Sequence, residues 1–133
     1  MLKGRAPAAV RAMERAVRKV ESDIASRLRP GVRGVDLHAR ALKMFARAGF
    51  DTGRAGGKAR GFFHGIGHGL GLEIHERPSM SARDEVLRRG DVVTVEPGLY
   101  YPEHGGIRHE NVYLLTDAGA RCLTRCRVPF EII

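Results

Sequence analysis

The sequence predicts a protein of the α+β class, in which two helices precede a run of strands. Two stretches near the start of the chain carry apolar residues at helical spacing, whereas later stretches alternate or form the short apolar runs that are typical of strands. Helices separated from the strands in this way pack on one face of a mostly antiparallel sheet. With 133 residues the chain has room for one domain, residues 1–133, which buries about two-thirds of the surface of the unfolded chain.

The two helices are defined by their apolar stripes and by their ends. Residues 8–28 place apolar side chains three and four positions apart, with Pro7 near the first turn. The sequence Arg-Pro-Gly at 29–31 ends this helix. A second helix is predicted over residues 35–48, with Gly49 as its terminator.

The remainder of the chain is predicted to form strands and loops. Residues 51–69 hold seven glycines and no apolar period, which is typical of a loop. Residues 70–74 alternate between apolar and other residues, which predicts a half-buried strand with His75 on its polar face. Further strands are predicted over residues 92–95, 107–115 and 121–125, with loops over 77–90 and 100–106 and a turn at 116–119.

The composition disfavours membrane and nucleic-acid functions. The chain is 43% hydrophobic and 29% charged, and no apolar run approaches the roughly 20 residues of a membrane-spanning helix. Its start lacks the apolar core of a secretory signal, so a cytoplasmic location is expected. The net charge is +8, but the arginines are scattered and no aromatic-rich basic face accompanies them. This pattern favours a solvated surface over nucleic-acid binding.

Two glutamates occupy positions where the strand pattern predicts apolar residues. Glu96 extends a short apolar run, and Glu110, together with Arg108, lies on a face shared with apolar residues of a later strand. A carboxylate in such a place is costly unless it is paired with a charge or bound to a metal. The sequence therefore predicts that His68, Glu96 and Glu110 converge on one cation. One imidazole with two carboxylates suits Mn, Fe, Co or Zn.

Each of these features also has an explanation without a metal site. A glutamate at a strand end is commonly solvated, and Arg108 and Glu110 can pair with neighbouring charges. The glycine-histidine stretch over residues 64–76 can form a flexible loop that scavenges metal. Taken together and in this order, the features favour the metal site.

Four segments of the chain carry motifs in a fixed order. They are RPGVRGVDLHARA at 29–41, HGIGHGLGLEIHERP at 64–78, LRRGDVVTVEPGLYY at 87–101 and GGIRHENVYLLTDAGARCLT at 105–124. Together they resemble the pita-bread metallopeptidases, which include methionine aminopeptidase, aminopeptidase P, prolidase and creatinase. The resemblance runs from about residue 7 to residue 123. It implies the C-terminal half of the pita-bread fold, in which two helices pack on a curved, mostly antiparallel sheet.

The resemblance implies a metal centre and its catalytic groups. It implies that His68, Glu96 and Glu110 are ligands of two divalent ions, such as Mn, Co, Zn or Fe, with a hydroxide between them. It also implies that His75 stabilises the tetrahedral intermediate, so that His75 and Glu96 are the catalytic residues. Such ions activate water and polarise the scissile carbonyl.

The resemblance further implies a substrate class. Its motif positions assign His64, His75 and Arg108 to peptide binding, and His64 and Arg108 resemble residues of the proline-specific branch, aminopeptidase P and prolidase. An Xaa-Pro peptide is therefore the expected substrate. Asn111 departs from the pattern, because the proline-specific enzymes commonly carry aspartate at this position.

The remaining family ligands are two aspartates that lie on a strand pair upstream of the first helix, where this chain has seven residues. Metal binding is therefore expected to be weak or absent. The chain is expected to be a fragment or truncated form of an Xaa-Pro metallopeptidase that is inactive alone. The alternative is a non-catalytic module of the same fold that binds peptides or proteins.

The complete pita-bread fold has two related halves that pack against each other. A chain that forms only one half is expected to leave an apolar face uncovered. Because contiguous apolar surface is usually covered by a partner, we expect either a homodimer or a separate N-terminal half at this face. In the homodimer, the second copy takes the place of the missing half. The other expected partner is the peptide substrate or ligand.

Overall fold

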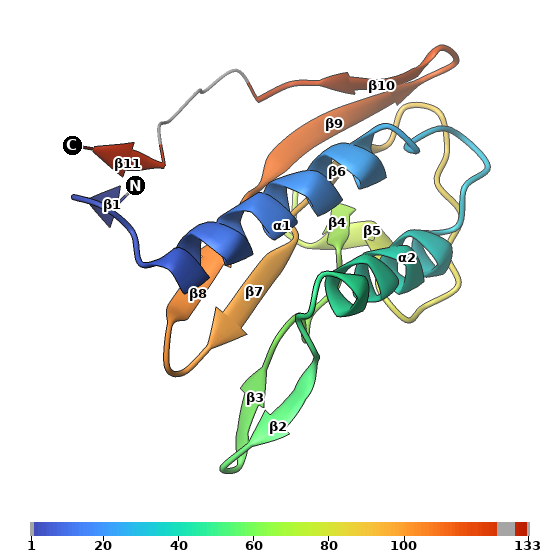
Figure 1. The fold of residues 1–133 in the computed structure, drawn as a ribbon. Helices are drawn as coiled ribbons and strands as arrows, with labels where there is room; N and C mark the ends of the chain where they lie inside the picture. The colour runs from blue at the N-terminus through green and yellow to red at the C-terminus, as the bar shows by residue number, and fades with distance from the viewer. Residues whose placement is uncertain (1, 125–129, 133) are drawn as a thin grey trace.

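The computed structural model describes residues 2–124 and 130–132. Its two helices, α1 (Ala8–Ala25) and α2 (Gly34–Arg47), lie across the strands on one side (Figure 1). Helix α1 contacts α2 and strands β6, β7 and β8, whereas α2 contacts β5. No helix among these residues combines the length and the apolar character that a membrane crossing requires. The predicted α+β class, with two helices on a sheet, is confirmed.

Helix α1 follows its predicted apolar stripe. Its buried apolar side chains recur at spacings of three and four: Val10, Met13, Val17, Val20 and Ile24. Pro7 directly precedes the helix, close to the first turn as predicted. The helix ends at Ala25, three residues earlier than predicted, because residues 26–28 continue as a turn in which the Leu28 N–H donates to the Ala25 carbonyl at 3.2 Å.

Helix α2 packs closely on the sheet. Its buried residues are Gly34, Leu37, Ala41 and Phe45. A side chain at Gly34 would overlap the backbone at Ser79, so glycine lets the helix start against strand β5. Gly49, with φ +83°, ends the helical segment as predicted.

The main sheet has five antiparallel strands in the order β10-β9-β6-β4-β5. Their bounds are β4 Gly67–Gly69, β5 Glu76–Met80, β6 Val92–Val95, β9 Asn111–Thr116 and β10 Gly119–Cys122. Three two-stranded sheets accompany it: β1 (Leu2–Lys3) with β11 (Glu131–Ile132), β2 (Gly53–Ala55) with β3 (Lys58–Arg60), and β7 (Gly98–Tyr101) with β8 (Gly105–Arg108). The first of these pairs is parallel and the other two are antiparallel.

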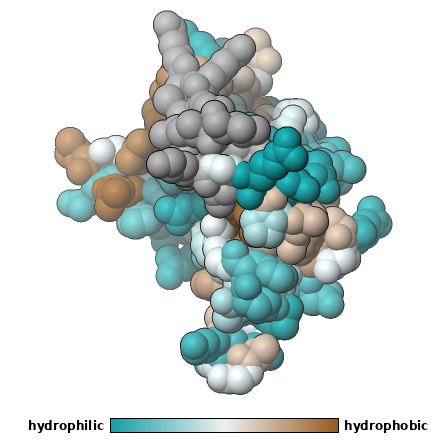
Figure 2. All heavy atoms as spheres, turned by 60° about the vertical axis from the view of Figure 1, so that its left-hand side comes forward, coloured by the Kyte–Doolittle hydropathy of each residue, from teal (hydrophilic) through white to brown (hydrophobic). Residues whose placement is uncertain are grey.

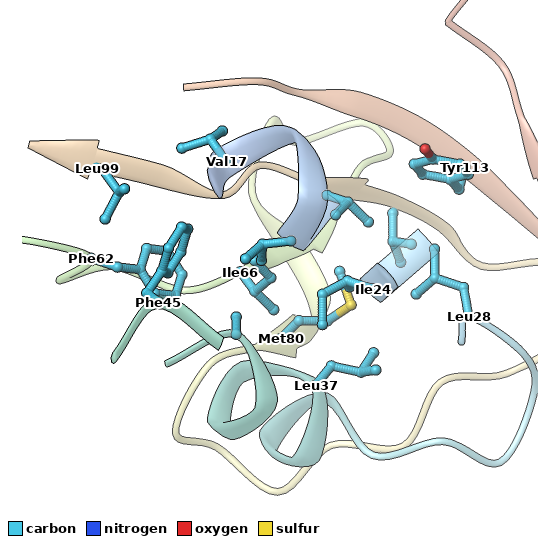
Figure 3. Close-up of a cluster of buried hydrophobic side chains, with 14 of the residues drawn as sticks. Val17, Ile24, Leu28, Leu37, Phe45, Phe62, Ile66, Met80, Leu99 and Tyr113 are labelled. Carbon is cyan, nitrogen blue, oxygen red and sulfur yellow. The ribbon is translucent and has the colours of Figure 1, made fainter. Parts of the chain in front are cut away.

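The core fills the space between the helices and the strands. Figure 3 shows side chains from both helices pointing toward those of the strands and of the segment before β4. Phe45 of α2 packs against Phe62, with ring centroids 5.3 Å apart, and both are essentially inaccessible to solvent. Ile66 and Met80 are likewise 0% exposed. The segment that carries the histidines is therefore anchored by its own apolar residues.

Two predictions for the glycine-rich region are wrong. Residues 70–74 form no strand, because β4 ends at Gly69 and the chain bends until β5 begins at Glu76. Leu72 and Ile74, which were expected to be half-buried, are 103% and 70% exposed. Residues 51–69 are not one loop, because they contain the β2–β3 hairpin and strand β4.

The predicted boundaries of the later strands need smaller corrections. Strand β6 matches the prediction of 92–95. The predicted strand at 107–115 is two strands, β8 and β9, because β8 pairs with β7 whereas β9 pairs with β6. The predicted loop over 100–106 is the end of β7, a turn and the start of β8, and the predicted loop over 77–90 begins with β5. The turn at 117–118 agrees, and residue 125 of the predicted last strand lies outside the described residues.

Candidate active site

His68 and Glu96 form the centre of the candidate site. His68 lies in β4 and Glu96 directly follows β6, and these neighbouring strands pair through Gly69 and Val93. The pairing brings His68 Nε2 within 3.1 Å of Glu96 Oε1. Both side chains are mostly buried, with 17% and 12% of their surfaces exposed.

Glycines on both sides of His68 make this approach possible. A Cβ at Gly67 would overlap the carbonyl oxygen of Thr94, and a Cβ at Gly69 would overlap that of Arg77. The alternation of glycine and histidine therefore lets neighbouring backbone lie close to β4 while one imidazole projects from it. This accounts for the pattern Gly-His-Gly in the sequence.

Thr94 fixes the relative position of His68 and Glu96. Its side-chain oxygen accepts a hydrogen bond from the His68 backbone N–H at 3.0 Å and donates to Glu96 Oε1 at 3.2 Å. The residue is 2% exposed. Sequence reasoning gave Thr94 no role in the site, although its hydroxyl lies on the same strand face as Glu96, two positions away.

The geometry of the pair fits a divalent cation. His68 Nδ1 lies 2.9 Å from the Gly69 carbonyl, which only accepts hydrogen bonds, so Nδ1 carries a proton. Nε2 then either carries a second proton or faces the carboxylate with its lone pair. In the second case two ligand atoms lie 3.1 Å apart, which matches the roughly 3 Å between atoms that each bind a common ion at about 2.1 Å. Two donors of this kind are a partial ligand set.

Arg108 lies between Glu96 and the third predicted ligand, Glu110. Its Nη1 is 3.5 Å from Glu96 Oε2, and its Nε is 3.9 Å from Glu110 Oε2. Glu110 has 42% of its side chain exposed. Within the part of the chain that the structure describes, no three His, Cys, Asp or Glu side chains are arranged to hold a metal ion. The structure thus brings His68 and Glu96 together and connects Glu110 to them through a guanidinium.

His75 reaches the site although it lies in no strand. The bend over residues 71–75 returns the chain so that the His75 ring lies 4.3 Å from the His68 ring, centroid to centroid. His75 itself is exposed. The imidazole is therefore open to a ligand that approaches the His68–Glu96 pair.

His64 lies in an aromatic cluster at the edge of the site. Its Nε2 is 3.1 Å from the Tyr100 hydroxyl, and its ring meets Phe62 edge-on at 4.9 Å. Burial raises the pKa of Tyr100, while Arg108 counteracts this shift. Tyr100 therefore connects His64 with Arg108, a role that sequence reasoning missed. Its position four residues after Glu96 places it on β7, the next strand along the chain.

Large apolar side chains beside these histidines are exposed. Phe63, next to His64, is 51% exposed, and Leu72 and Ile74 in the bend before His75 are more exposed still. Figure 2 shows apolar side chains (brown) that project from one side of the molecule among hydrophilic ones. Exposed apolar surface next to a site is typical of a face that binds a ligand or a partner.

Known proteins share the sequence motifs of this chain. Residues 1–117 match the profile of metallopeptidase family M24. An Xaa-Pro dipeptidase of Pyrococcus horikoshii is 38% identical over 98 residues, which are 73% of this chain and 26% of the relative. An Xaa-Pro dipeptidase of Pyrococcus furiosus is 49% identical over 65 residues, 48% of this chain and 19% of the relative.

Solved structures agree with the sequence comparisons. The prolidase of P. horikoshii superposes with a TM-score of 0.82 at 34% identity, over 93% of this chain and 34% of that one. The Xaa-Pro dipeptidase of Bacillus anthracis gives a TM-score of 0.85 at 30% identity, over 98% and 35% of the two chains. This chain therefore has the fold of part of a pita-bread prolidase and spans about a third of the length of these structures. The chain belongs to metallopeptidase family M24.

Proposed function

We propose that this chain supplies one side of the active site of an Xaa-Pro metallopeptidase. The contact of 3.1 Å between His68 Nε2 and Glu96 Oε1 carries the proposal, because it places two metal-binding groups from separate strands at one point. Several relatives are described as Xaa-Pro dipeptidases, which supports the proline-specific class. In this proposal His68, Glu96 and Glu110 hold a divalent ion, and Mn, Co, Zn and Fe all suit that donor set.

The other side chains of the site have roles that follow from their positions. A bound ion lowers the pKa of water and polarises the scissile carbonyl. Exposed His75, beside His68, donates a hydrogen bond to the oxyanion that develops on the substrate. His64 and Tyr100 bind the peptide, and Arg108 holds the carboxylates of Glu96 and Glu110 in place.

We propose that the 133-residue chain alone binds metal weakly and does not turn over peptide. The family ligand set includes two further aspartates, and most of the chain's own aspartates are engaged elsewhere. Asp23 binds Arg40 and Arg27, and Asp117 binds Arg89 at 3.0 Å. Asp36 and Asp84 pair with Arg33, and Asp91 accepts from the Arg88 N–H. These five aspartates are therefore not free to serve as ligands of a second ion.

We further propose that a second αβ unit covers the site in the functional assembly. The exposed side chains of Phe63, Leu72 and Ile74 support this proposal. A second copy of this chain would form a symmetric dimer, and a separate N-terminal half would supply aspartates. Sedimentation velocity distinguishes these cases, because the homodimer sediments as a dimer alone. We also assign the chain to the cytoplasm, where an exposed free thiol such as Cys122 stays reduced.

Calorimetric titration with Mn²⁺, Co²⁺ and Zn²⁺ tests the metal site. We expect saturable binding by the wild-type chain and its loss in His68→Ala and Glu96→Gln. His104→Ala is the matched control, because His104 is an exposed histidine in the β7–β8 turn. Equal binding by wild type and His68→Ala, or none by either, contradicts the proposal. Hydrolysis of an Xaa-Pro dipeptide by the chain alone contradicts the proposed inactivity.

A non-catalytic peptide-binding module is the second candidate. The separation of Glu110 from His68 by the Arg108 guanidinium favours it, because an ion pair needs no metal. Metal-independent binding of a proline-containing peptide, unchanged in Glu96→Gln, would support this candidate. Binding that requires both Mn²⁺ and His68 would favour the metallopeptidase.

A further inference from the structure

Helix α1 carries two carboxylates on the side that packs against the strands. Glu14 is 8% exposed and Glu21 is partly buried. The two residues are seven positions apart, so they lie on the same side of the helix. Buried carboxylates are costly unless they are paired, so both should have partners that bind them.

Both glutamates contact the segment that contains Glu110. Glu21 Oε1 accepts hydrogen bonds from Asn111 Nδ2 at 3.1 Å and from the Tyr113 hydroxyl. Glu14 Oε1 accepts from Arg18 Nε and lies 3.7 Å from His109 Nε2. The helix therefore contacts the residues on both sides of Glu110.

The partners alternate along the chain. Residues 109, 111 and 113 contact α1, whereas Arg108 lies within ion-pair distance of both Glu110 and Glu96. Successive side chains of an extended segment point to opposite sides. Because residues 109, 111 and 113 are held against the helix, the direction in which residues 108 and 110 point is determined.

We infer that Glu14 and Glu21 are positioning residues, which hold His109 and Asn111 and thereby orient Glu110 and Arg108 toward Glu96. The inference rests on the proposed metal site for its functional consequence. It also gives a physical reason for Asn111, since its amide donates to Glu21 whereas an aspartate would place a second carboxylate about 3 Å from the first.

A charge swap tests this inference. Asn111→Asp sets two carboxylates against each other, and the double variant Glu21→Gln/Asn111→Asp restores an amide–carboxylate pair with its direction reversed and the net charge of the wild type. We expect Asn111→Asp to weaken Co²⁺ binding by about tenfold or more, as losses of groups that orient metal ligands do. The double variant should recover to within about threefold of wild type, since the pair is restored. Ala118→Asp, in the exposed β9–β10 turn, controls for the added negative charge.

Amide hydrogen exchange gives a readout that does not depend on metal. Residues 108–112 should exchange faster in Asn111→Asp and regain protection in the double variant, with unchanged exchange in α2. If wild type shows no saturable metal binding, the proposed metal site fails, and exchange alone decides the positioning role. A lower unfolding free energy in Asn111→Asp with unchanged exchange at 108–112, or no recovery in the double variant, overturns the inference.

Discussion

The region under the helices and the region around His68 differ in how completely their groups are covered. Under the helices, Met13 and Phe45 are 0% exposed, and the carboxylates of Glu14 and Glu21 have partners. Around His68, Leu72 and Ile74 are 70% exposed or more, and Arg108 binds carboxylates only at 3.5 Å and beyond. The difference indicates that the helical region supplies stability, whereas the region around His68 leaves apolar surface and charge exposed.

Phe45→Ala should have the largest effect on stability. The side chain packs against Phe62 in the closed core, and its removal leaves a cavity. We expect the free energy of unfolding to fall by about 3–5 kcal/mol, measured by urea denaturation. Leu72→Ala, in the site region, should change it by less than about 0.5 kcal/mol. Similar losses in both variants would contradict the division between the regions.

Gly67→Ala tests whether strand β4, which carries His68, is rigid. The added methyl group would overlap the Thr94 carbonyl oxygen, which belongs to a paired strand and cannot move freely. We expect a loss of about 3 kcal/mol in thermal unfolding, near the upper end for overpacking. Gly53→Ala is the control, because a Cβ there meets no atom within 4 Å. A stable Gly67→Ala variant would mean that β4 adjusts more readily than its contacts indicate.

Thr94→Val should have an intermediate effect. The change keeps the shape of the side chain but removes the partner of the His68 N–H and the donor to Glu96. An unpaired buried N–H costs about 1–2 kcal/mol of unfolding free energy. Chemical shifts of His68 should also change in NMR spectra, with those of α2 as internal reference. Unchanged stability and shifts would show that Thr94 does not fix the pair.

Asp23→Asn should have the smallest effect, and one that depends on pH. Arg40 first, and then Arg27, lower the pKa of Asp23 below its usual value of 3.8, so its stabilising contribution is present above about pH 4 and lost as the pH falls further. We expect the variant to lose about 1 kcal/mol at pH 7, because these ion pairs reach the surface. The difference from wild type should shrink in acid-unfolding curves below pH 4. A difference that is constant with pH would show that the charge of Asp23 is not its cause.

The sequence predicted the elements whose apolar pattern faces the core. Helices α1 and α2 and strand β6 lie within three residues of their predicted bounds, because burial on one side is the cause of their periodicity. The β2–β3 hairpin was missed because its residues are nearly all exposed, although Gly56-Gly57 between short extended runs is a hairpin signal. The alternation in residues 70–74 failed as a strand signal, since this segment is the connection between Gly69 of β4 and Glu76 of β5, which pair with each other.

The site was predicted in part. Motif positions identified His68 and Glu96, which the structure brings together, and His75 beside them. The contribution of Thr94 depends on which residues of β4 and β6 lie opposite each other, and a single sequence does not reveal this register. The sequence indicated that Arg108 can pair with neighbouring charges, but it did not reveal that Glu96 is one of them.

The alternation along residues 108–113 leaves this segment intolerant of changes in length. One inserted or deleted residue between Arg108 and Tyr113 would turn the site-facing carboxylate toward the helix and send a helix-bound group outward. A substitution there can be compensated by a second substitution, as in a charge swap. A shifted alternation of side-chain directions can be restored only by a second insertion or deletion nearby. We therefore expect natural variants of this chain to differ here in residue type and not in residue number.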